Sequence, residues 1–150
     1  MIITFCGHRD YIRKDADEQK VLEILECEVG NSECEFFLGG YGGFDGFAHS
    51  CVKKYKETHP NVKLIFVTPY MDEKYIKSHT EYMRDIEVVY PPVETAPKKF
   101  AISHRNRWMM EQADVVIAYV CHSYGGAYNS YKHARAKGKK IYNISTNAVN

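Results

Sequence analysis

The chain has 150 residues, of which 45% are hydrophobic, and its formal net charge at pH 7 is +1. A charge so close to zero excludes a global field that attracts nucleic acid or an anionic membrane, although a local basic groove is compatible with it. No apolar run reaches the roughly 18 residues that a membrane-spanning helix needs. Met1 leads directly into a predicted strand, so we expect no signal peptide.

The cysteines indicate a reducing compartment. They are five in number, and no Cys-x-x-Cys pair occurs among Cys6, Cys27, Cys34, Cys51 and Cys121. Each lies inside or at the edge of a predicted strand or helix, as reduced and mostly buried thiols do. We therefore expect a cytoplasmic protein, and the length predicts a single domain over residues 1–150.

The first half of the chain predicts two strand–helix units. An apolar strand over Ile2–Cys6 leads through Gly7-His8-Arg9 into a helix over about Arg13–Val29. The apolar stripe of this helix consists of Val21, Leu22, Leu25 and Val29. A second strand over Cys34–Leu38 leads into Gly39–Gly46, which holds five glycines in eight positions. A flexible linker is the alternative there, but helical periodicity begins at once, on a face made of Phe44, Phe47, Ala48, Cys51, Val52 and Tyr55.

The second half continues the alternation. The predicted strands are Val62–Thr68, Ile86–Tyr90, Val115–Cys121 and Ile141–Ile144. The predicted helices are one capped by Asp72 that runs to about Met83, one opened by Pro97, and one from about Ala127 that ends at Gly138. Strands that alternate with helices predict an α/β fold, in which a mostly parallel sheet with right-handed crossovers is flanked by helices.

A ligand site is predicted at one edge of this sheet. Ligands of such sheets bind outside the carboxyl ends of the strands. Polar and glycine-rich stretches follow four of the predicted strands, at Gly7-His8-Arg9, Gly39–Asp45, Pro69-Tyr70 and Ser123–Gly126. The last of these joins a buried strand to a helix, an arrangement that aims backbone N–H groups at an anion, usually a phosphate. A plain tight turn is the alternative for that stretch alone, but the convergence of four stretches favours a site.

Three segments resemble the SLOG superfamily, which groups the DNA-processing protein A domain with the cytokinin-activating Lonely guy proteins. Gly40–His49 is similar to the family pattern Ser-Gly-x-Ala-x-Gly-Ile-Asp-x-x-Ala-His, with Asp45, Ala48 and His49 matching. Phe100–Arg107 ends in the Arg-Asn-Arg that precedes the fifth strand. Ala113–Val116, followed by Gly125-Gly126 and a helix, resembles the closing module of the family. The resemblance spans Phe5–Ile144 and is nearest to the small stand-alone YpsA-like members of bacteria and phages.

The resemblance implies a Rossmann-like three-layer sandwich that binds a nucleotide or a nucleotide-derived molecule, such as an ADP-ribose-like signal. It implies that Arg105 and Asn106 hold phosphate and sugar together with the glycine-rich loops. Together with the stretches that follow the strands, it gives the candidate ligand-binding residues Gly7, His8, Arg9, Gly40, Tyr41, Gly42, Gly43, Asp45, Pro69, Tyr70, Arg105, Asn106, Ser123, Tyr124, Gly125, Gly126 and Tyr128.

One departure from the family bears on catalysis. Its phosphoribohydrolases carry Pro-Gly-Gly-x-Gly-Thr-x-x-Glu, whereas this chain has Tyr128 at the third glycine position and Lys132 at the glutamate position. Cleavage of an N-glycosidic bond needs a carboxylate near the ribose, and a protonated lysine cannot replace it. Asp45 is the one obvious substitute in the loops. The resemblance therefore favours a binding protein over an enzyme.

Three functions are compatible with these residues. The first is a sensor or sequestering protein for a nucleotide-derived ligand, in which tyrosines stack on a base while Arg9 and Arg105 bind phosphate. The second is a nucleotide N-glycosidic hydrolase, with Asp45 and His8 or His49 in acid–base roles. The third is a single-stranded DNA-binding protein, which stacking tyrosines suit and the net charge does not.

The sequence carries weaker signals for cofactors and for assembly than for the ligand site. His8, His49, His104 and His122 show no diagnostic ligand spacing, so we expect no metal, and nothing in the sequence indicates a cofactor. The resemblance implies a homodimer or a higher homo-oligomer. The predicted contact is the face of the fourth helix that carries Trp108, Met109 and Met110.

Overall fold

The computed structural model describes residues 1–81, 83, 85–92 and 97–149. The strands are β1 (Ile2–Gly7), β2 (Cys34–Leu38), β3 (Val62–Val67), β4 (Ile86–Val89), β5 (Val115–Tyr119) and β6 (Lys140–Asn143). The α-helices are α1 (Asp15–Glu28), α2 (Gly43–Lys56), α3 (Glu73–Thr80), α4 (Ala101–Gln112) and α5 (Gly125–Ala136). A short 3₁₀ turn, Lys98–Phe100, precedes α4.

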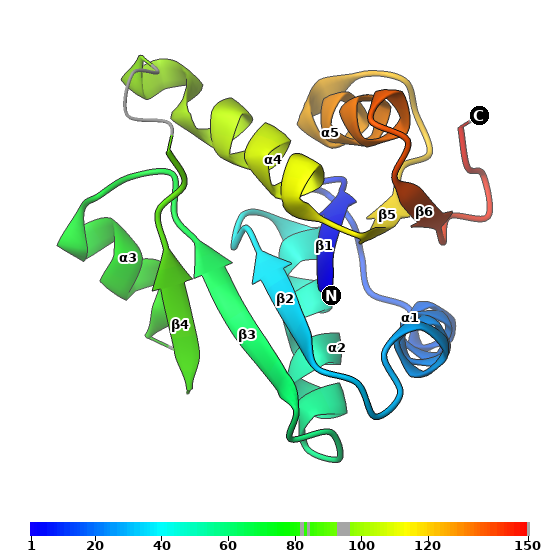
Figure 1. The fold of residues 1–150 in the computed structure, drawn as a ribbon. Coiled ribbons are helices and arrows are strands. Elements are labelled where there is room, and N and C mark those ends of the chain that lie inside the picture. The colour runs from blue at the N-terminus through cyan, green and yellow to red at the C-terminus, as the bar shows by residue number, and fades with distance from the viewer. Residues whose placement is uncertain (82, 84, 93–96, 150) are drawn as a thin grey trace.

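The six strands form one sheet in the order β4-β3-β2-β1-β5-β6, and every neighbouring pair is parallel. Helices α1 and α2 lie on one side of the sheet, and α4 and α5 lie on the other (Figure 1). This arrangement confirms the predicted Rossmann-like α/β sandwich, although the sheet is entirely rather than mostly parallel. The strand order turns back on itself between β1 and β5, so the connections that follow these two strands diverge.

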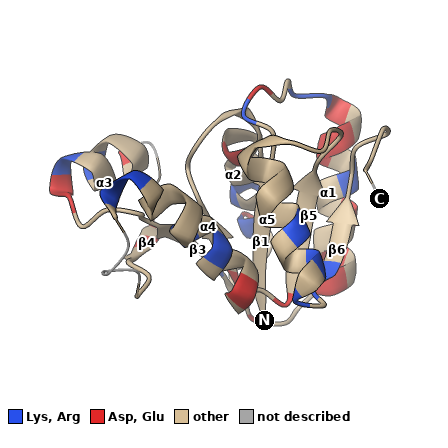
Figure 2. Cartoon of the chain, turned by 90° about the horizontal axis from the view of Figure 1, so that it is seen from above, with Lys and Arg blue, Asp and Glu red and all other residues tan. Residues whose placement is uncertain are grey.

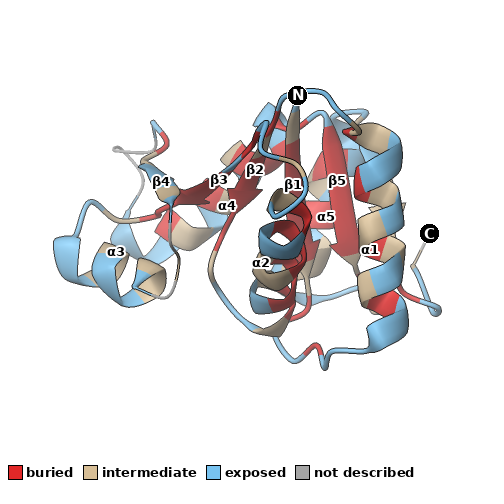
Figure 3. Ribbon diagram, turned by 90° about the horizontal axis from the view of Figure 1, so that it is seen from below, coloured by how far each residue is buried: buried red, intermediate tan, exposed pale blue. Residues whose placement is uncertain are grey.

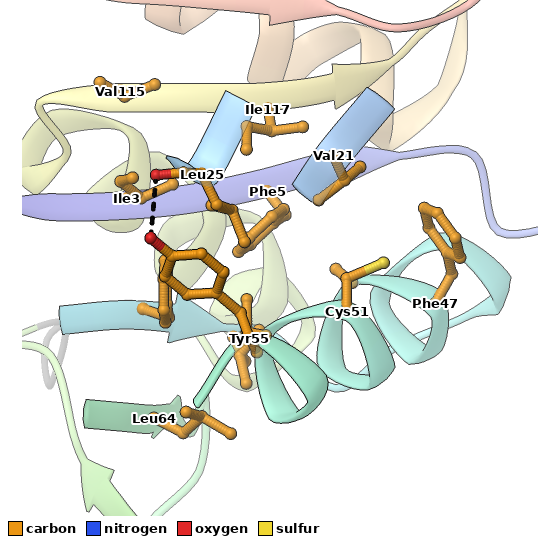
Figure 4. Close-up of a cluster of buried hydrophobic side chains, with 14 of the residues drawn as sticks. Ile3, Phe5, Val21, Leu25, Phe47, Cys51, Tyr55, Leu64, Val115 and Ile117 are labelled. Carbon is orange, nitrogen blue, oxygen red and sulfur yellow. Dashed lines mark hydrogen bonds between the residues drawn. The ribbon is translucent and has the colours of Figure 1, made fainter. Parts of the chain in front are cut away.

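The larger core joins α1 and α2 to the sheet. The α1 stripe packs as expected, because Val21, Leu25 and Val29 are buried and Leu22 is half-buried. The Tyr55 hydroxyl donates a hydrogen bond of 3.3 Å to the Leu25 carbonyl oxygen and so links the two helices (Figure 4). All six residues of the predicted α2 face are buried, and Figure 3 shows that the central strands are buried as well. The glycine stretch is therefore an ordered connection and not a flexible linker.

The second core lies under α4 and α5, and it corrects the predicted oligomer contact. Met109 and Met110 are only 3% and 0% exposed, because they pack against the sheet. Trp108 is half-buried and stacks on Phe37 at 5.6 Å between ring centroids. The side chains proposed for the contact are thus used within this chain.

Several element boundaries differ from the sequence prediction. β5 ends at Tyr119 and not at Cys121, because the neighbouring strand β1 ends at Gly7, which pairs with Tyr119. α5 begins at Gly125 instead of Ala127, because Tyr124 is still extended and the chain turns at Gly125, whose φ is +90°. α3 ends at Thr80, whereas the predicted helix ran to about Met83 and so included residue 82, which lies outside the described residues.

Acidic residues lie in the first turns of α1, α2 and α3, where the helix dipole favours them. Figure 2 shows both signs of charge along α1, and its first turn carries Asp15, Asp17 and Glu18. Asp72 caps α3 as predicted, since its side chain accepts hydrogen bonds from the backbone N–H groups of Lys74 and Tyr75. In the part of the chain that the structure describes, no helix is both long enough and apolar enough to cross a membrane.

Gly7 is a packing requirement of this fold, and we predict that Gly7→Ala destabilises it. A Cβ atom at Gly7 would lie 2.2 Å from Cγ of Phe44, which is completely buried. Overpacking of this kind costs about 1–3 kcal/mol, which corresponds to a fall of roughly 3 to 10 °C in the unfolding midpoint. Gly46→Ala is the matched control, because a Cβ there meets nothing within 4 Å. Equal midpoints for the two variants in thermal unfolding would contradict the prediction.

Candidate functional site

A cavity of about 440 Å³ opens at the carboxyl ends of β1 and β5, where the strand order turns back on itself. Ten of the predicted ligand-binding residues line it, namely Gly7, His8, Arg9, Tyr41, Asp45, Arg105, Asn106, Tyr124, Gly125 and Gly126. The sequence analysis did not assign the other lining residues to a ligand, namely Phe5, Cys6, Asp10, Ile102, Met109, Met110, His122, Ala127 and Ser130. A signal for two of them existed, because Ile102 and Met109 lie three residues before and four residues after Arg105 on one helical face.

The remaining predicted residues do not line this cavity. Gly42 and Gly43 instead pack against the loop after β1, since a Cβ at Gly42 would lie 2.7 Å from Cγ of Arg9 and one at Gly43 would lie 2.4 Å from the Tyr11 carbonyl oxygen. Gly40 has a φ of +65° and packs against Phe66. Close packing or a positive φ therefore explains why these three positions are glycine, without any contact to a ligand. Pro69 and Tyr70 line a separate hollow, and neither Ser123 nor Tyr128 lines the main cavity.

The N-terminus of α5 faces the cavity with uncapped backbone N–H groups. Tyr124, at the N-cap position, makes no side-chain hydrogen bond to the helix. A Cβ at Gly125 or Gly126 would meet nothing within 4 Å, so the space before this helix end is open. The unbonded N–H groups and the positive end of the helix dipole together favour an anion here.

Arg105 is buried at the sheet edge, where it joins two strands. Its side chain is only 1% exposed, and its Nη1 group donates hydrogen bonds of 2.8 Å to the carbonyl oxygens of both Gly39 and Val67. Its Nε group donates to Oδ1 of Asn106 at 2.9 Å. Among the described residues, no hydrogen bond uses Nη2 of Arg105. The guanidinium therefore joins the ends of β2 and β3 and leaves one amino group beside the cavity.

Asp45 brings a carboxyl group that is an unusually weak acid to the cavity wall. Its Oδ2 accepts a hydrogen bond of 2.9 Å from the backbone N–H of Tyr41. Although part of its surface is accessible, the carboxyl is closely enclosed by protein atoms, and this burial raises its pKa to about 6. The Tyr41 N–H and the charge of Arg105 act in the opposite direction but do not cancel the effect. Asp45 can therefore exchange a proton near neutral pH.

Three rings are stacked from the cavity interior to the protein surface. The His8 ring is buried and lies 3.6 Å from the ring of His122, which lies 3.9 Å from that of Tyr124. Nε2 of His8 accepts a hydrogen bond of 3.0 Å from the backbone N–H of Cys121, which places the proton of the neutral ring on Nδ1. Burial, and then the neighbouring His122, lower the pKa of His8. Tyr124 is 69% exposed at the outer end of the stack, so its ring is available to a further ring.

The cavity supports neither a thiolate nucleophile nor a clustered metal site. Burial, and then the nearby Asp45, raise the pKa of the Cys6 thiol far above its ordinary value, so Cys6 stays protonated. Across residues 1–81, 83, 85–92 and 97–149, no group of three or more His, Cys, Asp or Glu side chains could hold a metal ion. Of the four histidines considered for a metal, His8 and His122 line the cavity, whereas His49 and His104 do not.

Two comparisons give the chain known counterparts, and no protein-family model matches it. The chain is 25% identical to the uncharacterised SPbeta prophage-derived protein YoqJ of Bacillus subtilis (strain 168), in a 138-residue alignment that covers 79% of this chain and 80% of that protein. Its fold is similar to that of DNA processing protein A from Helicobacter pylori, whose structure was described for its single-stranded DNA binding mode. That likeness has a TM-score of 0.60 at 19% identity, and it covers 94% of this chain and 63% of the other. At this identity it establishes the fold, and the chain spans less than two thirds of that neighbour.

The raised pKa of Asp45 gives a testable dependence of stability on pH. A folded-state pKa above the unfolded value means that the neutral carboxyl stabilises the fold, and this contribution is complete below about pH 4 and is lost as the pH rises through about 6. Asp45→Asn keeps a side-chain oxygen for the Tyr41 N–H and has no charge. We predict that the variant gains stability relative to the wild type between pH 4 and pH 8, by up to roughly 3 kcal/mol.

Chemical denaturation at both pH values measures this difference. Asp10→Asn is the matched control, because Asp10 lines the same cavity but is exposed. A stability difference between Asp45→Asn and the wild type that stays constant across this pH range would contradict the assignment.

The ring stack predicts a second pH effect of the opposite sign. The folded-state pKa of His8 lies below its unfolded value, so its contribution is present above about pH 6.5 and is lost as the pH falls. Protonation of Nε2 removes the acceptor for the Cys121 N–H. We predict that the unfolding midpoint of His8→Gln falls less steeply between pH 7 and pH 5 than that of the wild type. Thermal unfolding checks this, with the exposed His104→Gln as the control, and equal slopes for His8→Gln and the wild type would refute it.

Proposed function

We propose that this protein binds a nucleotide or a nucleotide-derived, ADP-ribose-like molecule in the main cavity and acts as a sensor or sequestering protein. The observation that carries the proposal is the uncapped N-terminus of α5, which faces the cavity beside an exposed aromatic ring. On this proposal the chain is a member of the SLOG superfamily, near its YpsA-like proteins. The likeness to DNA processing protein A supports the fold that this membership requires.

The phosphate of the ligand binds at the helix end. The N–H groups at the start of α5 supply directed donors, and the open space at Gly125 and Gly126 allows an oxygen to approach the backbone closely. Arg9 adds a positive charge at the rim. Its Nη1 group donates to the Tyr41 hydroxyl at 3.0 Å, and no carboxylate among the described residues forms an ion pair with it. Arg105, which is already bonded to two carbonyl oxygens, holds the wall in place.

The base of the ligand extends the ring stack. Tyr124 already lies against His122 on one face, and its exposed surface is available to a planar base. Tyr41 is 44% exposed on the loop opposite and supplies a second aromatic surface. A volume of about 440 Å³ is within the range of small-molecule sites, about 300–1,000 Å³.

Binding fits these residues better than hydrolysis of the glycosidic bond. Lys132, at the position where hydrolases carry glutamate, is exposed and does not line the cavity, and its Nζ lies 5.5 Å from the centre of the Tyr128 ring. Asp10 and Asp45 are the two carboxylates that line the cavity. Asp45, with a pKa of about 6, is the group that carries the hydrolase alternative.

We predict that a nucleotide ligand raises the unfolding midpoint and that Gly126→Leu abolishes the rise. A ligand at about 100 times its dissociation constant adds roughly 2.7 kcal/mol, which corresponds to about 5–10 °C for a chain of this size. The leucine side chain extends into the space where the phosphate would lie. Gly46→Leu is the matched control, because Gly46 is also a helical glycine with nothing within 4 Å of its Cβ position.

The screen covers mononucleotides, dinucleotides, ADP-ribose and cyclic derivatives, and chromatography then checks each mixture for breakdown. A shift with intact ligand supports the proposal. A shift accompanied by release of the base, which Asp45→Asn prevents, would replace it with the hydrolase. The absence of a shift with every compound would refute the small-ligand proposal.

Binding of single-stranded DNA is the second candidate. The structural neighbour from Helicobacter pylori is described as a single-stranded DNA-binding protein, and Tyr41 and Tyr124 are exposed at the cavity rim. Aromatic rings on a positively charged surface suit unpaired bases of any sequence. Binding of oligothymidylate that weakens steeply with salt, without binding of any mononucleotide, would favour this candidate.

A further inference from the structure

A second hollow, of about 300 Å³, lies at the carboxyl edge of the same sheet. It follows β3 and β4, whereas the main cavity follows β1 and β5. The two share no lining residue, and the second hollow is lined by Pro69, Tyr70, Met71, Asp72, Tyr90, Lys98 and Ala101. The proposed function does not use this hollow.

Helix α4 places the two hollows next to each other. Ala101 lines the second hollow, and Arg105, four residues later on the same helical face, lines the main cavity. Four residues of an α-helix span about 6 Å along its axis. Nη1 of Arg105 also binds the carbonyl oxygen of Val67, two residues before Pro69. The Arg105 guanidinium therefore lies at the boundary between the hollows, with its Nη2 group lacking a hydrogen-bond partner among the described residues.

The second hollow has a fixed aromatic wall. The hydroxyl of Thr68 donates to the Tyr70 carbonyl oxygen at 2.7 Å and accepts from the Tyr70 N–H at 3.3 Å, which holds the backbone of Tyr70 in place. The Tyr70 ring packs edge to face against Tyr75, with 5.0 Å between ring centroids. Tyr90 supplies a second ring, and Met71 is 76% exposed beside them. The Tyr70 ring, held in this way, suits a planar base, because little side-chain freedom is lost on binding.

Among the described residues, the charge that has no partner at this hollow is positive. The carboxylate of Asp72 accepts hydrogen bonds from the N–H groups of Lys74 and Tyr75, so the N-terminus of α3 compensates its charge. Lys98 is exposed, and no ion pair within the described part of the chain involves it. A ligand that has both a flat ring and a negative charge therefore fits the hollow best.

We propose that the second hollow receives a second nucleotide unit, so that the ligand consists of two nucleotides joined through phosphate. The first unit lies in the main cavity, and in this respect the inference rests on the proposed function. The linking phosphate spans the wall that the buried Arg105 holds in place, and the second base stacks on Tyr70 beside Lys98. A free dinucleotide and the end of a single strand share this chemistry.

Calorimetric titration of the full chain with thymidine 5′-monophosphate, the dinucleotide pdTpdT and a ten-residue oligothymidylate tests the proposal. We expect the dinucleotide to bind at least about tenfold more tightly than the mononucleotide. An oligonucleotide affinity equal to that of the dinucleotide assigns a free dinucleotide, and a further gain assigns a strand. Equal affinities for the mononucleotide and the dinucleotide would overturn the proposal.

Substitutions in the second hollow test the second subsite separately from ligand binding in the main cavity. Tyr70→Ala should weaken dinucleotide binding roughly 5- to 150-fold, as the loss of one base stack does, and leave mononucleotide binding unchanged. Tyr70→Leu keeps apolar packing and removes the ring, so it gives the same result without loss of folding. Lys98→Ala should act in the same direction, whereas the matched Lys99→Ala, at an exposed neighbour outside the hollow, should not.

Equal losses for Lys98→Ala and Lys99→Ala, or a mononucleotide affinity that falls with Tyr70→Leu, would count against the second subsite. Failure of the wild type to bind the mononucleotide would count against the proposed function. In that case, dinucleotide binding that depends on Tyr70 would still support the second hollow.

Discussion

The carboxyl edge of the sheet depends on the buried guanidinium of Arg105. The carbonyl groups at the ends of parallel strands point away from the sheet and lose their ladder partners, so each must find a donor elsewhere. One side chain from α4 supplies that donor for β2 at Gly39 and for β3 at Val67. Hydrogen bonds from a charged group are worth more than neutral ones, about 1.5–3 kcal/mol each. Arg105 thereby fixes α4 against the strand ends and sets the wall that the main cavity and the second hollow have in common.

A second constraint closes the other side of the cavity. The loop before α2 approaches the loop after β1 so closely that Gly42 and Gly43 leave no room for a side chain against Arg9 and Tyr11. The Gly43 N–H donates a hydrogen bond of 2.8 Å to the Arg9 carbonyl oxygen and joins the two loops. These contacts bring Asp45, in the first turn of α2, next to the end of β1. Some glycines of the stretch Gly39–Gly46 are thus required for packing, whereas Gly125 and Gly126 have no such packing partner.

The hydrophobic periodicity of the sequence predicted most of the fold. β2 begins and ends at the predicted residues, and the α2 face is buried as its spacing required, because helix and strand periodicity is set by neighbouring residues. The position of the cavity also followed from the sequence, since topology brings the strand ends together. The ring stack could not be predicted, because His8 and His122 come from connections that are distant in the sequence. Neither could the hydrogen bonds of Arg105, since a sequence does not show which carbonyl oxygens a buried arginine meets.

The energetics of two cavity groups agree with the proposed binding of a ligand. Both groups are held in states that lower the stability of the fold. Asp45 keeps a carboxyl whose charge is disfavoured by burial, and Nδ1 of His122 is buried with no hydrogen-bond partner in the described part of the chain. A buried polar atom without a partner costs about 1–3 kcal/mol, and groups with a shifted pKa gather at functional sites in native proteins. Both groups line the main cavity beside an uncapped helix end and an exposed ring, which on the proposed function bind the phosphate and the base of the ligand.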